Sequence, residues 1–368
     1  MKFEELGLSK KMLEAVQAQG FTQPTKIQEL AIPKILKGTN LIGQAPTGTG
    51  KTMAYLLPIF EQLNAEESTI QALILSPTYE LTMQTARTAA MLADNGIGLK
   101  AQGLVGGANI ARQIEALKKK KPQIISGSVG RILELARLKK LKLNNVKFLV
   151  LDEFDRLLDD QNFNSTIEVK NLLPKDIVCL MFSATLTKKA MERSSQFAEM
   201  ELIRVKADSE FAAQRDNTYE IIEFREKIAE VRKLTRRLSI QRGLVFVNRN
   251  SNAEWTLEKL RYDGIKADSL IGKANKVTRK QAIANFKSGK IQLLLSTDLA
   301  ARGLDIENVD YVINLDFPEN AQMYLHRAGR TARAGATGSV ITLVDRKELD
   351  KLAELESKLH IKFRNLKK

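Results

Sequence analysis

The chain has 368 residues, which is too long for one ordinary hydrophobic core and predicts two domains. Its 58 lysines and arginines exceed its 43 acidic residues and give a net charge of +15, which suits a polyanionic partner such as nucleic acid, although surplus lysine can also serve solubility alone. No apolar run is long enough to cross a membrane, and one cysteine with two histidines excludes an internal disulfide and argues against a structural zinc site.

The first twenty residues have mixed charge and a helical pattern, without the apolar core and cleavage site of a secretory signal. We therefore expect them to form the first helix of the fold. The lone cysteine, Cys179, lies in an apolar run and fits a reducing compartment. Together these features predict a cytoplasmic protein without a membrane partner.

Short apolar runs alternate with helical patterns from one end of the chain to the other. We predict strands at 40–45, 71–77, 100–107, 122–128, 147–153 and 178–185, and then at 218–224, 242–248, 265–272, 291–298, 309–316 and 338–344. Apolar strands separated by helices are typical of parallel sheets buried on both faces. The two sets predict two α/β domains, each a doubly wound parallel sheet, at residues 1–206 and 218–368. A short polar linker is expected at 207–217, and a helix with a short basic end after Asp345.

The segment GQAPTGTGKT, Gly43–Thr52, joins a predicted strand to a predicted helix, which is the context of a phosphate-binding loop. Glycines let the backbone curl, so that its N–H groups and the helix N-terminus surround phosphate oxygens. The residues predicted to bind the nucleotide are Thr47, Gly48, Thr49, Gly50, Lys51 and Thr52. Lys51 would reach between phosphates, and the Thr52 hydroxyl would bind Mg²⁺. A plain glycine-rich helix cap is the alternative, although a cap does not need this sequence. Ala45 and Pro46 depart from the general loop pattern and indicate a narrower class.

An apolar strand followed by two acids, KFLVLDEFD, supplies what such a loop needs for chemistry. Asp152 ends the strand at the edge where the phosphates would lie, which suits it to hold Mg²⁺, partly through water. Glu153 beside it is the candidate general base for an attacking water. A solvated acidic turn is the competing interpretation, and the buried strand directly before Asp152 disfavours it.

Five further motifs complete a pattern that spans Phe3 to about Val344: GFTQPTKIQ, DEFD, SAT at Ser183–Thr185, STDLAARGLD and HRAGRTAR. With the phosphate loop, they resemble the DEAD-box family of ATP-dependent RNA helicases in superfamily 2. The resemblance implies two RecA-like domains, ATP and Mg²⁺ as cofactors, RNA as partner, and a compact bacterial-type helicase core.

The resemblance also implies roles at the nucleotide. Gln28 would read adenine with its amide, and Phe21 would line the adenine site, whereas Phe3 can equally be a core residue. From the second domain, Arg330 and Arg333 are three residues apart and would share one helical face near the γ-phosphate. Asp305 would contact the ribose, while His326 and Arg327 would link the nucleotide to SAT. The active site would then need both domains, so neither half should hydrolyse ATP well alone.

RNA contacts are implied at segments of both domains. The candidates are Pro77, Thr78, Gly107, Ser128 and Arg131 in the first domain and Arg279, Thr297 and the weaker Asn248 in the second. Small residues and backbone amides indicate a sequence-tolerant hold on the RNA backbone. Taken one at a time, the glycines could be ordinary turns and the arginines solvated charges.

Several positions depart from the family pattern. They are Tyr79 for arginine, Phe154 for alanine, Val129 for proline, Lys276 for glutamine, and Ala328 and Ala332 for isoleucine and glycine. The catalytic set is intact and the RNA-contact set is altered, so the efficiency of unwinding stays open. An ATP-dependent RNA clamp, a DNA-directed helicase and a nucleotide binder without turnover are the competing functions. We expect a monomer that acts on ribosomal or structured messenger RNA, by analogy alone.

Overall fold

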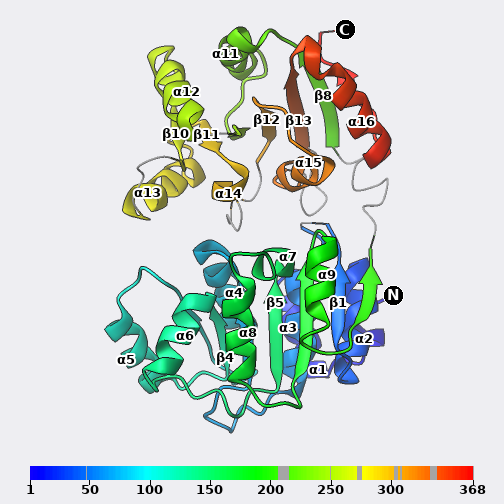
Figure 1. Cartoon of the computed structure of the whole chain (residues 1–368), viewed down its shortest axis with the longest axis vertical. Coiled ribbons are helices and arrows are strands. Elements are labelled where there is room, and N and C mark those ends of the chain that lie inside the picture. The colour runs from blue at the N-terminus through cyan, green and yellow to red at the C-terminus, as the bar shows by residue number, and fades with distance from the viewer. Residues whose placement is uncertain are drawn as a thin grey trace. The chain divides into compact units, whose positions relative to one another are not determined.

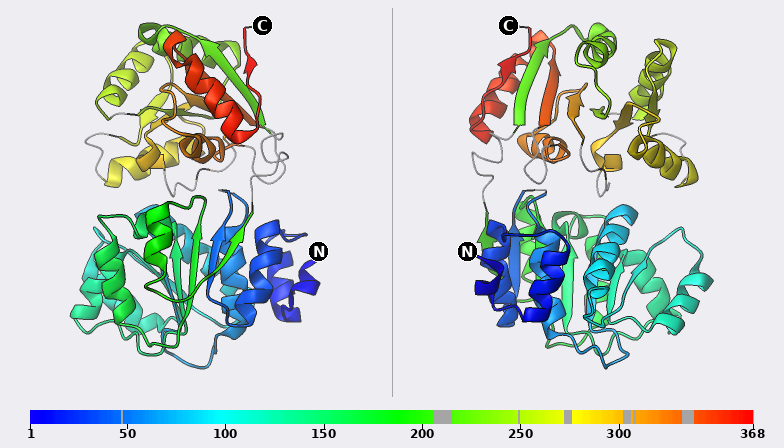
Figure 2. Two further views of the ribbon diagram at one scale, coloured as in Figure 1. Left: turned by 45° about the vertical axis from the view of Figure 1, so that its right-hand side comes forward. Right: turned by 180° about the vertical axis from the view of Figure 1, so that it is seen from behind.

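A computed structural model describes the chain except for Thr47, 206–214, Arg249, 272–275, 302–305, 307–308, 332–337 and Lys368. The chain divides into two compact units, Met1–Lys206 and Ala207–Lys368 (Figure 1). Each unit is built on a seven-stranded sheet in which every strand pairing is parallel. Helices lie on both faces of each sheet, as the further views of Figure 2 show. The prediction of two doubly wound α/β domains is confirmed.

The sheet of unit 1 has the strand order β3-β4-β2-β5-β6-β1-β7. Its strands are β1 (Leu41–Gln44), β2 (Ala72–Leu75), β3 (Ala101–Leu104), β4 (Ile124–Gly127), β5 (Phe148–Asp152), β6 (Val178–Ser183) and β7 (Glu201–Arg204). Six of these lie inside predicted strands. The seventh, β7, was not predicted because it is an edge strand in which only Ile203 is buried, so it has no apolar run.

Two apolar cores cover the two faces of this sheet, because successive residues of a strand point to opposite faces. In β5, Phe148 and Val150 belong to one core, while Leu149 and Leu151 belong to the other. The first core includes α1 (Lys10–Ala18), α2 (Lys26–Leu36), α3 (Lys51–Gln62) and α4 (Tyr79–Ala93). The second includes α5 (Ile110–Lys120), α6 (Val129–Arg137), α7 (Phe154–Leu157), α8 (Phe163–Asn171) and α9 (Lys188–Ser194).

The sheet of unit 2 has the order β10-β11-β9-β12-β13-β8-β14. Its strands are β8 (Arg215–Ile221), β9 (Gly243–Phe246), β10 (Ala267–Ser269), β11 (Leu293–Ser296), β12 (Tyr311–Asn314), β13 (Gly338–Val344) and β14 (Arg364–Asn365). Its helices are α11 (Lys227–Arg237), α12 (Asn250–Tyr262), α13 (Lys276–Lys287), α14 (Asp298–Ala301), α15 (Ala321–Ala328) and α16 (Leu349–Leu359).

Strand β8 begins inside the segment expected to be linker. Arg215 and Asn217 looked like linker residues because they are polar, but both are buried. The Arg215 side chain donates to the carbonyls of Ala328 and Thr331 at 3.0 Å each. The expected basic end adds the short strand β14, which pairs with β8. Among the residues that the structure describes, no helix is long and apolar enough to cross a membrane.

Candidate active site

The phosphate loop follows β1, and α3 begins at Lys51. Gly48 and Gly50 have φ of 83° and 84°, a region that glycine enters without the cost of a Cβ. The ammonium group of Lys51 donates to the carbonyls of Ala45 and Pro46 at 2.7 and 2.8 Å. The Thr49 hydroxyl donates to the Pro46 carbonyl at 2.7 Å. The loop is therefore curled around a lysine at a helix N-terminus, the arrangement that binds phosphate. Thr47 lies outside the described residues.

Gln28 connects α2 to this loop. Its side-chain oxygen accepts from the Thr25 N–H at 2.9 Å, and its amide nitrogen donates to the Gly50 carbonyl at 3.1 Å. A Cβ added at Gly50 would lie 2.4 Å from that nitrogen. Each end of the amide keeps capacity for one more hydrogen bond, which is compatible with the expected contact to adenine. Phe21 is 43% exposed, whereas Phe3 is buried in the core.

Asp152 ends β5 and is buried beside the tyrosine of α3. The Tyr55 hydroxyl donates to the carboxylate of Asp152 at 3.0 Å, and Thr52 is within hydrogen-bonding reach of the same hydroxyl. Burial raises the pKa of Asp152, while the positive charge of Lys51 opposes that rise. Burial and the Asp152 charge raise the pKa of Tyr55, so its hydroxyl stays a donor. Asp152 and Thr52 thus flank one buried hydroxyl.

Glu153 follows with a left-handed backbone, at φ 55° and ψ 50°. A non-glycine residue in this region is strained by roughly 1–2 kcal/mol, and such strain gathers at functional sites. The next residue, Phe154, is fully buried in the second core. The large side chain that replaces the family's alanine is thus accommodated by packing behind the acids.

Asp155 fastens the loop after β6. Its two carboxylate oxygens accept hydrogen bonds from the hydroxyls of Ser183 and Thr185, both at 2.6 Å. The Thr185 N–H also donates to the Ser183 hydroxyl at 3.1 Å. Distances this short are typical of hydroxyls bound to an ionised carboxylate. The acidic motif and SAT are therefore joined as one unit, which we call the Asp155 clamp.

The candidate RNA residues of unit 1 lie at the carboxyl edge of the same sheet. Pro77 and Thr78 follow β2, Gly107 follows β3 and Ser128 follows β4. These three strands are neighbours, and β5, β6 and β1 continue the row toward the phosphate loop. Because all strands are parallel, one edge of the sheet carries the RNA set on one half and the ATP set on the other.

Three of these RNA candidates also form hydrogen bonds that stabilise the surrounding loops and helices. The Thr78 hydroxyl caps α4 by accepting from the Leu81 N–H at 3.2 Å, and the Ser128 hydroxyl accepts from the Gly106 N–H at 3.3 Å. Arg131 is 6% exposed, and its guanidinium donates to the Ala108 carbonyl at 3.1 Å. It therefore holds the loop after β3 from beneath, which differs from the solvated charge considered above.

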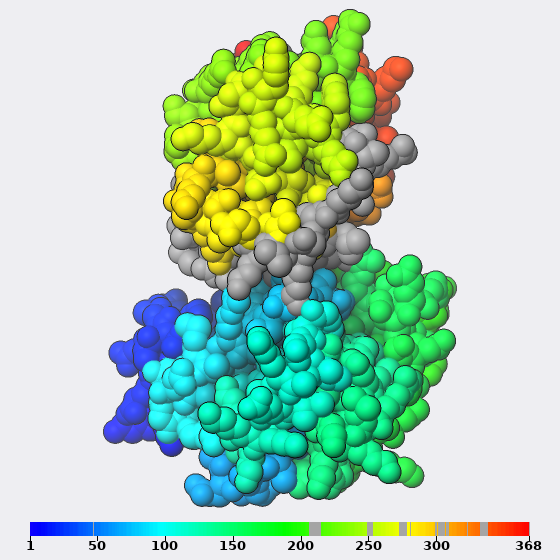
Figure 3. Space-filling view, turned by 90° about the vertical axis from the view of Figure 1, so that its left-hand side faces the viewer, coloured from blue at the N-terminus to red at the C-terminus, as the bar shows by residue number. Residues whose placement is uncertain are grey.

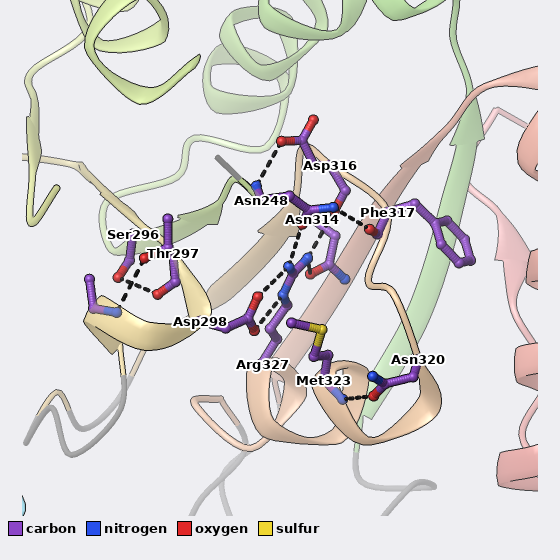
Figure 4. A network of polar contacts seen from close by, with 11 residues as sticks. Asn248, Ser296, Thr297, Asp298, Asn314, Asp316, Phe317, Asn320, Met323 and Arg327 are labelled. Atoms are coloured by element: carbon purple, nitrogen blue, oxygen red, sulfur yellow. Dashed lines mark hydrogen bonds and ion pairs between the residues drawn. The ribbon is translucent and has the colours of Figure 1, made fainter. Parts of the chain in front are cut away.

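Arg327 organises the carboxyl edge of the unit 2 sheet, as the close view in Figure 4 shows. It is fully buried and binds the Asp298 carboxylate through two bonds of 2.9 and 2.6 Å. It also donates to Asn248, Asn314 and the Asp316 carbonyl at 2.8, 3.2 and 2.8 Å. These partners follow or end β11, β9 and β12. Arg327 therefore holds the ends of these strands together inside unit 2, and its expected link to SAT stays a prediction.

The expectation that Arg330 and Arg333 share a helical face is wrong. Helix α15 ends at Ala328, and the N–H of Gly329 caps it by bonding to the carbonyls of Arg327 and Leu325. Arg330 is a buried residue beyond that end, and His326 lies half-buried in the last turn. A glycine after the last turn is a common stop signal, which the helical spacing argument overlooked. Arg333 and Asp305 lie outside the described residues.

The unit 2 RNA candidates Thr297 and Arg279 converge on Ala300 of α14. The Thr297 hydroxyl accepts from the Ala300 N–H at 3.2 Å, and the Arg279 guanidinium donates to the Ala300 carbonyl at 2.6 Å. Asn248, the weaker candidate, contacts Phe317 and Arg327. Thr297 and Arg279 therefore position the short helix after β11.

Comparison with known proteins decides the family. Residues 25–193 match the DEAD/DEAH box helicase family, and residues 226–335 match the helicase conserved C-terminal domain. The chain is 40% identical over 351 residues to the DEAD-box ATP-dependent RNA helicase CshC of Bacillus cereus, covering 95% of this chain and 89% of that protein. The chain belongs to the DEAD-box family of ATP-dependent RNA helicases. It is also 41% identical to the probable ATP-dependent RNA helicase YfmL of Bacillus subtilis, over 94% of this chain and 91% of YfmL.

Solved DEAD-box structures have the same two-domain RecA-like fold. Dbp5 of S. cerevisiae, bound to RNA and ADP BeF3, matches with a TM-score of 0.88 and 29% identity, over 99% of this chain and 95% of that chain. Mss116p bound to ssRNA and AMP-PNP matches with a TM-score of 0.85 and 27% identity, over 99% and 78%.

The sequence did not single out two residues of this DEAD-box site. Tyr55 lies one helical turn after Thr52, a spacing that points both side chains the same way and could have drawn attention to it. Asp298 stands within STDLAARGLD, next to the Thr297 that we did select. Its ion pair with Arg327 joins segments 29 residues apart, a pairing that sequence spacing does not reveal.

Proposed function

We propose that this ATP-dependent RNA helicase separates short RNA duplexes locally and couples each event to hydrolysis of ATP to ADP and phosphate. The single observation that carries the proposal is the Asp155 clamp. It joins the acidic motif beside the phosphate loop to the loop after β6, at the sheet edge that also carries the RNA candidates. A change at the nucleotide therefore has a short covalent and hydrogen-bonded path to the RNA side.

We assign the nucleotide chemistry of unit 1 as follows. The loop residues Gly48–Thr52 and Thr47 bind the phosphates, with Lys51 neutralising their charge. Thr52 and Asp152 would hold Mg²⁺, directly or through water, and the ion would neutralise charge on the phosphate oxygens. The hydroxyl–carboxylate pair around Tyr55 has the oxygen donors that Mg²⁺ prefers. Glu153 acts as general base, and Gln28 and Phe21 recognise adenine.

Unit 2 contributes to the same reaction in this proposal. Arg330 and Arg333 stabilise charge on the transferring phosphoryl group, Asp305 binds the ribose, and His326 assists from the last turn of α15. Buried Arg327 fixes the local fold that presents them. RNA is gripped by Pro77, Thr78, Gly107, Ser128, Arg131, Arg279 and Thr297. If ATP and RNA favour one conformation, each must raise the affinity of the other by the same factor.

The second candidate function is an ATP-dependent RNA clamp that remodels complexes with little strand separation. It is favoured by the altered RNA-contact positions, above all Tyr79, which is 39% exposed where the family has arginine. We further propose a cytoplasmic monomer that acts on structured or ribosomal RNA, for which light scattering in solution tests the monomeric state.

Strand release from a short RNA duplex tests the main proposal. We expect release to require ATP, to be blocked in Glu153→Gln, and to fall steeply as the duplex lengthens. ATPase stimulation by RNA but not by DNA of the same sequence is the matching control. RNA-stimulated hydrolysis without release of even the shortest duplex would favour the clamp, and equal stimulation by DNA would contradict the RNA assignment.

A further inference from the structure

Seven lysines outside every motif gather at the carboxyl ends of α5 and α6 in unit 1. They are the run Lys118–Lys121 together with Lys139, Lys140 and Lys142, and we call them the lysine patch. All seven side chains are exposed. Within the part of the chain that the structure describes, none of them forms an ion pair. Figure 3 looks onto the side of unit 1 that carries these two helices.

The topology places the two groups of lysines at the same edge of the sheet. Helix α5 connects β3 to β4 and α6 connects β4 to β5, two steps in the same direction across the sheet. Right-handed crossovers place both helices on one face, and both pack into the second core of the unit. Their carboxyl ends lead to the starts of β4 and β5, so both groups of lysines lie at the edge where strands begin. This edge is opposite to the one with the phosphate loop.

The backbone indicates that the fold does not need these lysines. Lys121 has φ of 46° and Lys139 has φ of 55°, each just past the end of a helix. Glycine is the common residue in this left-handed position, because a side chain is strained there. The helix dipole favours cations in the last turn of each helix, but not at Lys142 beyond it. Glu134 and Glu168 pair with Arg131 and Arg137 instead. The exposed acids at this edge include Glu66 and Glu67, in the loop whose carbonyls the Gln123 side chain contacts.

We propose that the lysine patch binds the phosphate backbone of RNA that extends beyond the segment held at the carboxyl edge. Lysine is a flexible point charge suited to phosphates, whereas protein interfaces are depleted in lysine. The only large exposed apolar side chain among these lysines is Leu138, so little apolar surface is offered to a protein or a membrane. The patch would bind any sequence, since no base-reading group accompanies it.

The distance fits an RNA that crosses this side of the unit. Helix α5 has 11 residues, which is about 16 Å at the standard rise. Its amino end adjoins the loop that contains Gly107, and Ser128 directly precedes the amino end of α6. The two helices therefore run from the RNA candidates at one edge to the lysine patch at the other. The inference rests on the proposed RNA binding at those candidates.

The test compares a short and a long RNA on matched variants. The patch variant is Lys119→Gln, Lys120→Gln, Lys139→Gly and Lys140→Gln. The control is Lys2→Gln, Lys10→Gln, Lys11→Gln and Lys37→Gln, which removes the same charge from exposed lysines of α1, α2 and their flanks. Binding is measured with single strands of about 8 and about 30 nucleotides, across a salt series. Lys139→Gly relieves a positive φ, so this substitution does not threaten the fold.

We expect the patch variant to bind the long RNA roughly tenfold more weakly at low salt. The slope of log affinity against log salt concentration should be smaller by about 3, since each of the four lost phosphate contacts contributes about 0.7 on single strands. Its affinity for the short RNA should stay within twofold, as should both affinities of the control. Three results would overturn the inference. The patch variant could lose equal affinity for short and long RNA, the control could lose as much affinity as the patch variant, or the patch variant could lose binding to anionic lipid vesicles while its RNA binding is unchanged. Failure of the parent protein to bind the short RNA would instead count against the proposed function.

Discussion

Thr185→Val should weaken the Asp155 clamp by removing one of its two hydroxyl–carboxylate bonds, with little change in side-chain volume. The substitution removes a hydroxyl that donates to the Asp155 carboxylate at 2.6 Å. Hydrogen bonds to charged groups contribute about 1.5–3 kcal/mol, so unit 1 should lose free energy of unfolding in that range. Ser183 keeps its own 2.6 Å bond to the other carboxylate oxygen. Half of the clamp therefore survives, and the unit should still fold.

Hydrogen exchange read by mass spectrometry gives the stability of each unit separately, because the chain need not unfold in one step. Peptides of β5 and β6 should lose protection, and peptides of unit 2 should not change. Thr88→Val is the matched control, because the Thr88 hydroxyl donates only to the neutral Gln84 carbonyl at 3.1 Å. A double-mutant cycle with Asp155→Asn isolates the pair. A coupling energy below about 0.5 kcal/mol, or equal effects of Thr185→Val and Thr88→Val, would refute the reasoning.

Two further predictions concern the nucleotide site. Asp152→Asn should abolish ATP hydrolysis but raise the melting temperature of unit 1 at neutral pH, because burial raises the folded-state pKa of Asp152 and its ionised form therefore costs stability. The gain in melting temperature should shrink as the pH falls through that pKa, since the parent carboxyl is then protonated too. A gain that stays constant at all pH values would contradict the raised pKa. Gly50→Ala should weaken ATP binding, measured by titration, by at least about tenfold, because the added Cβ would lie 2.4 Å from the Gln28 amide nitrogen at a φ of 84°. Gly38→Ala is the control, since Gly38 has a similar φ of 78° but an added Cβ would have nothing within 4 Å. This control should leave the ATP affinity unchanged.

The sequence predicts best those elements that are determined by short contiguous patterns of residues. Apolar runs such as the one in β5 locate the buried parallel strands, and the glycine-rich loop and the acids after β5 follow directly from local context. Edge elements escape this reasoning, because β7 is mostly exposed and β14 has only two residues. Their pairing depends on the neighbours β1 and β8 rather than on their own composition.

Contacts between distant segments could not be predicted from spacing. The bond from Tyr55 to Asp152 joins residues 97 positions apart, and the bond from Ser183 to Asp155 spans 28. Arg327 was predicted from its motif to link the nucleotide site to SAT, and its contacts with Asp298 and three other partners inside unit 2 do not follow from that motif. A motif identifies a charged residue such as Arg327, but only the three-dimensional structure shows which opposite charge pairs with it inside the fold.

ATP hydrolysis measured with and without single-stranded RNA tests the central claim most directly, for the intact protein and for Glu153→Gln, Lys51→Ala and Arg330→Ala. The account predicts stimulation by RNA in the parent, and at least about 100-fold loss of hydrolysis in each variant. ATP binding should be retained by Glu153→Gln and weakened by Lys51→Ala. Full hydrolysis in Glu153→Gln, or in Arg330→Ala, would contradict the assignment of a reaction that needs the acids of unit 1 and a guanidinium of unit 2.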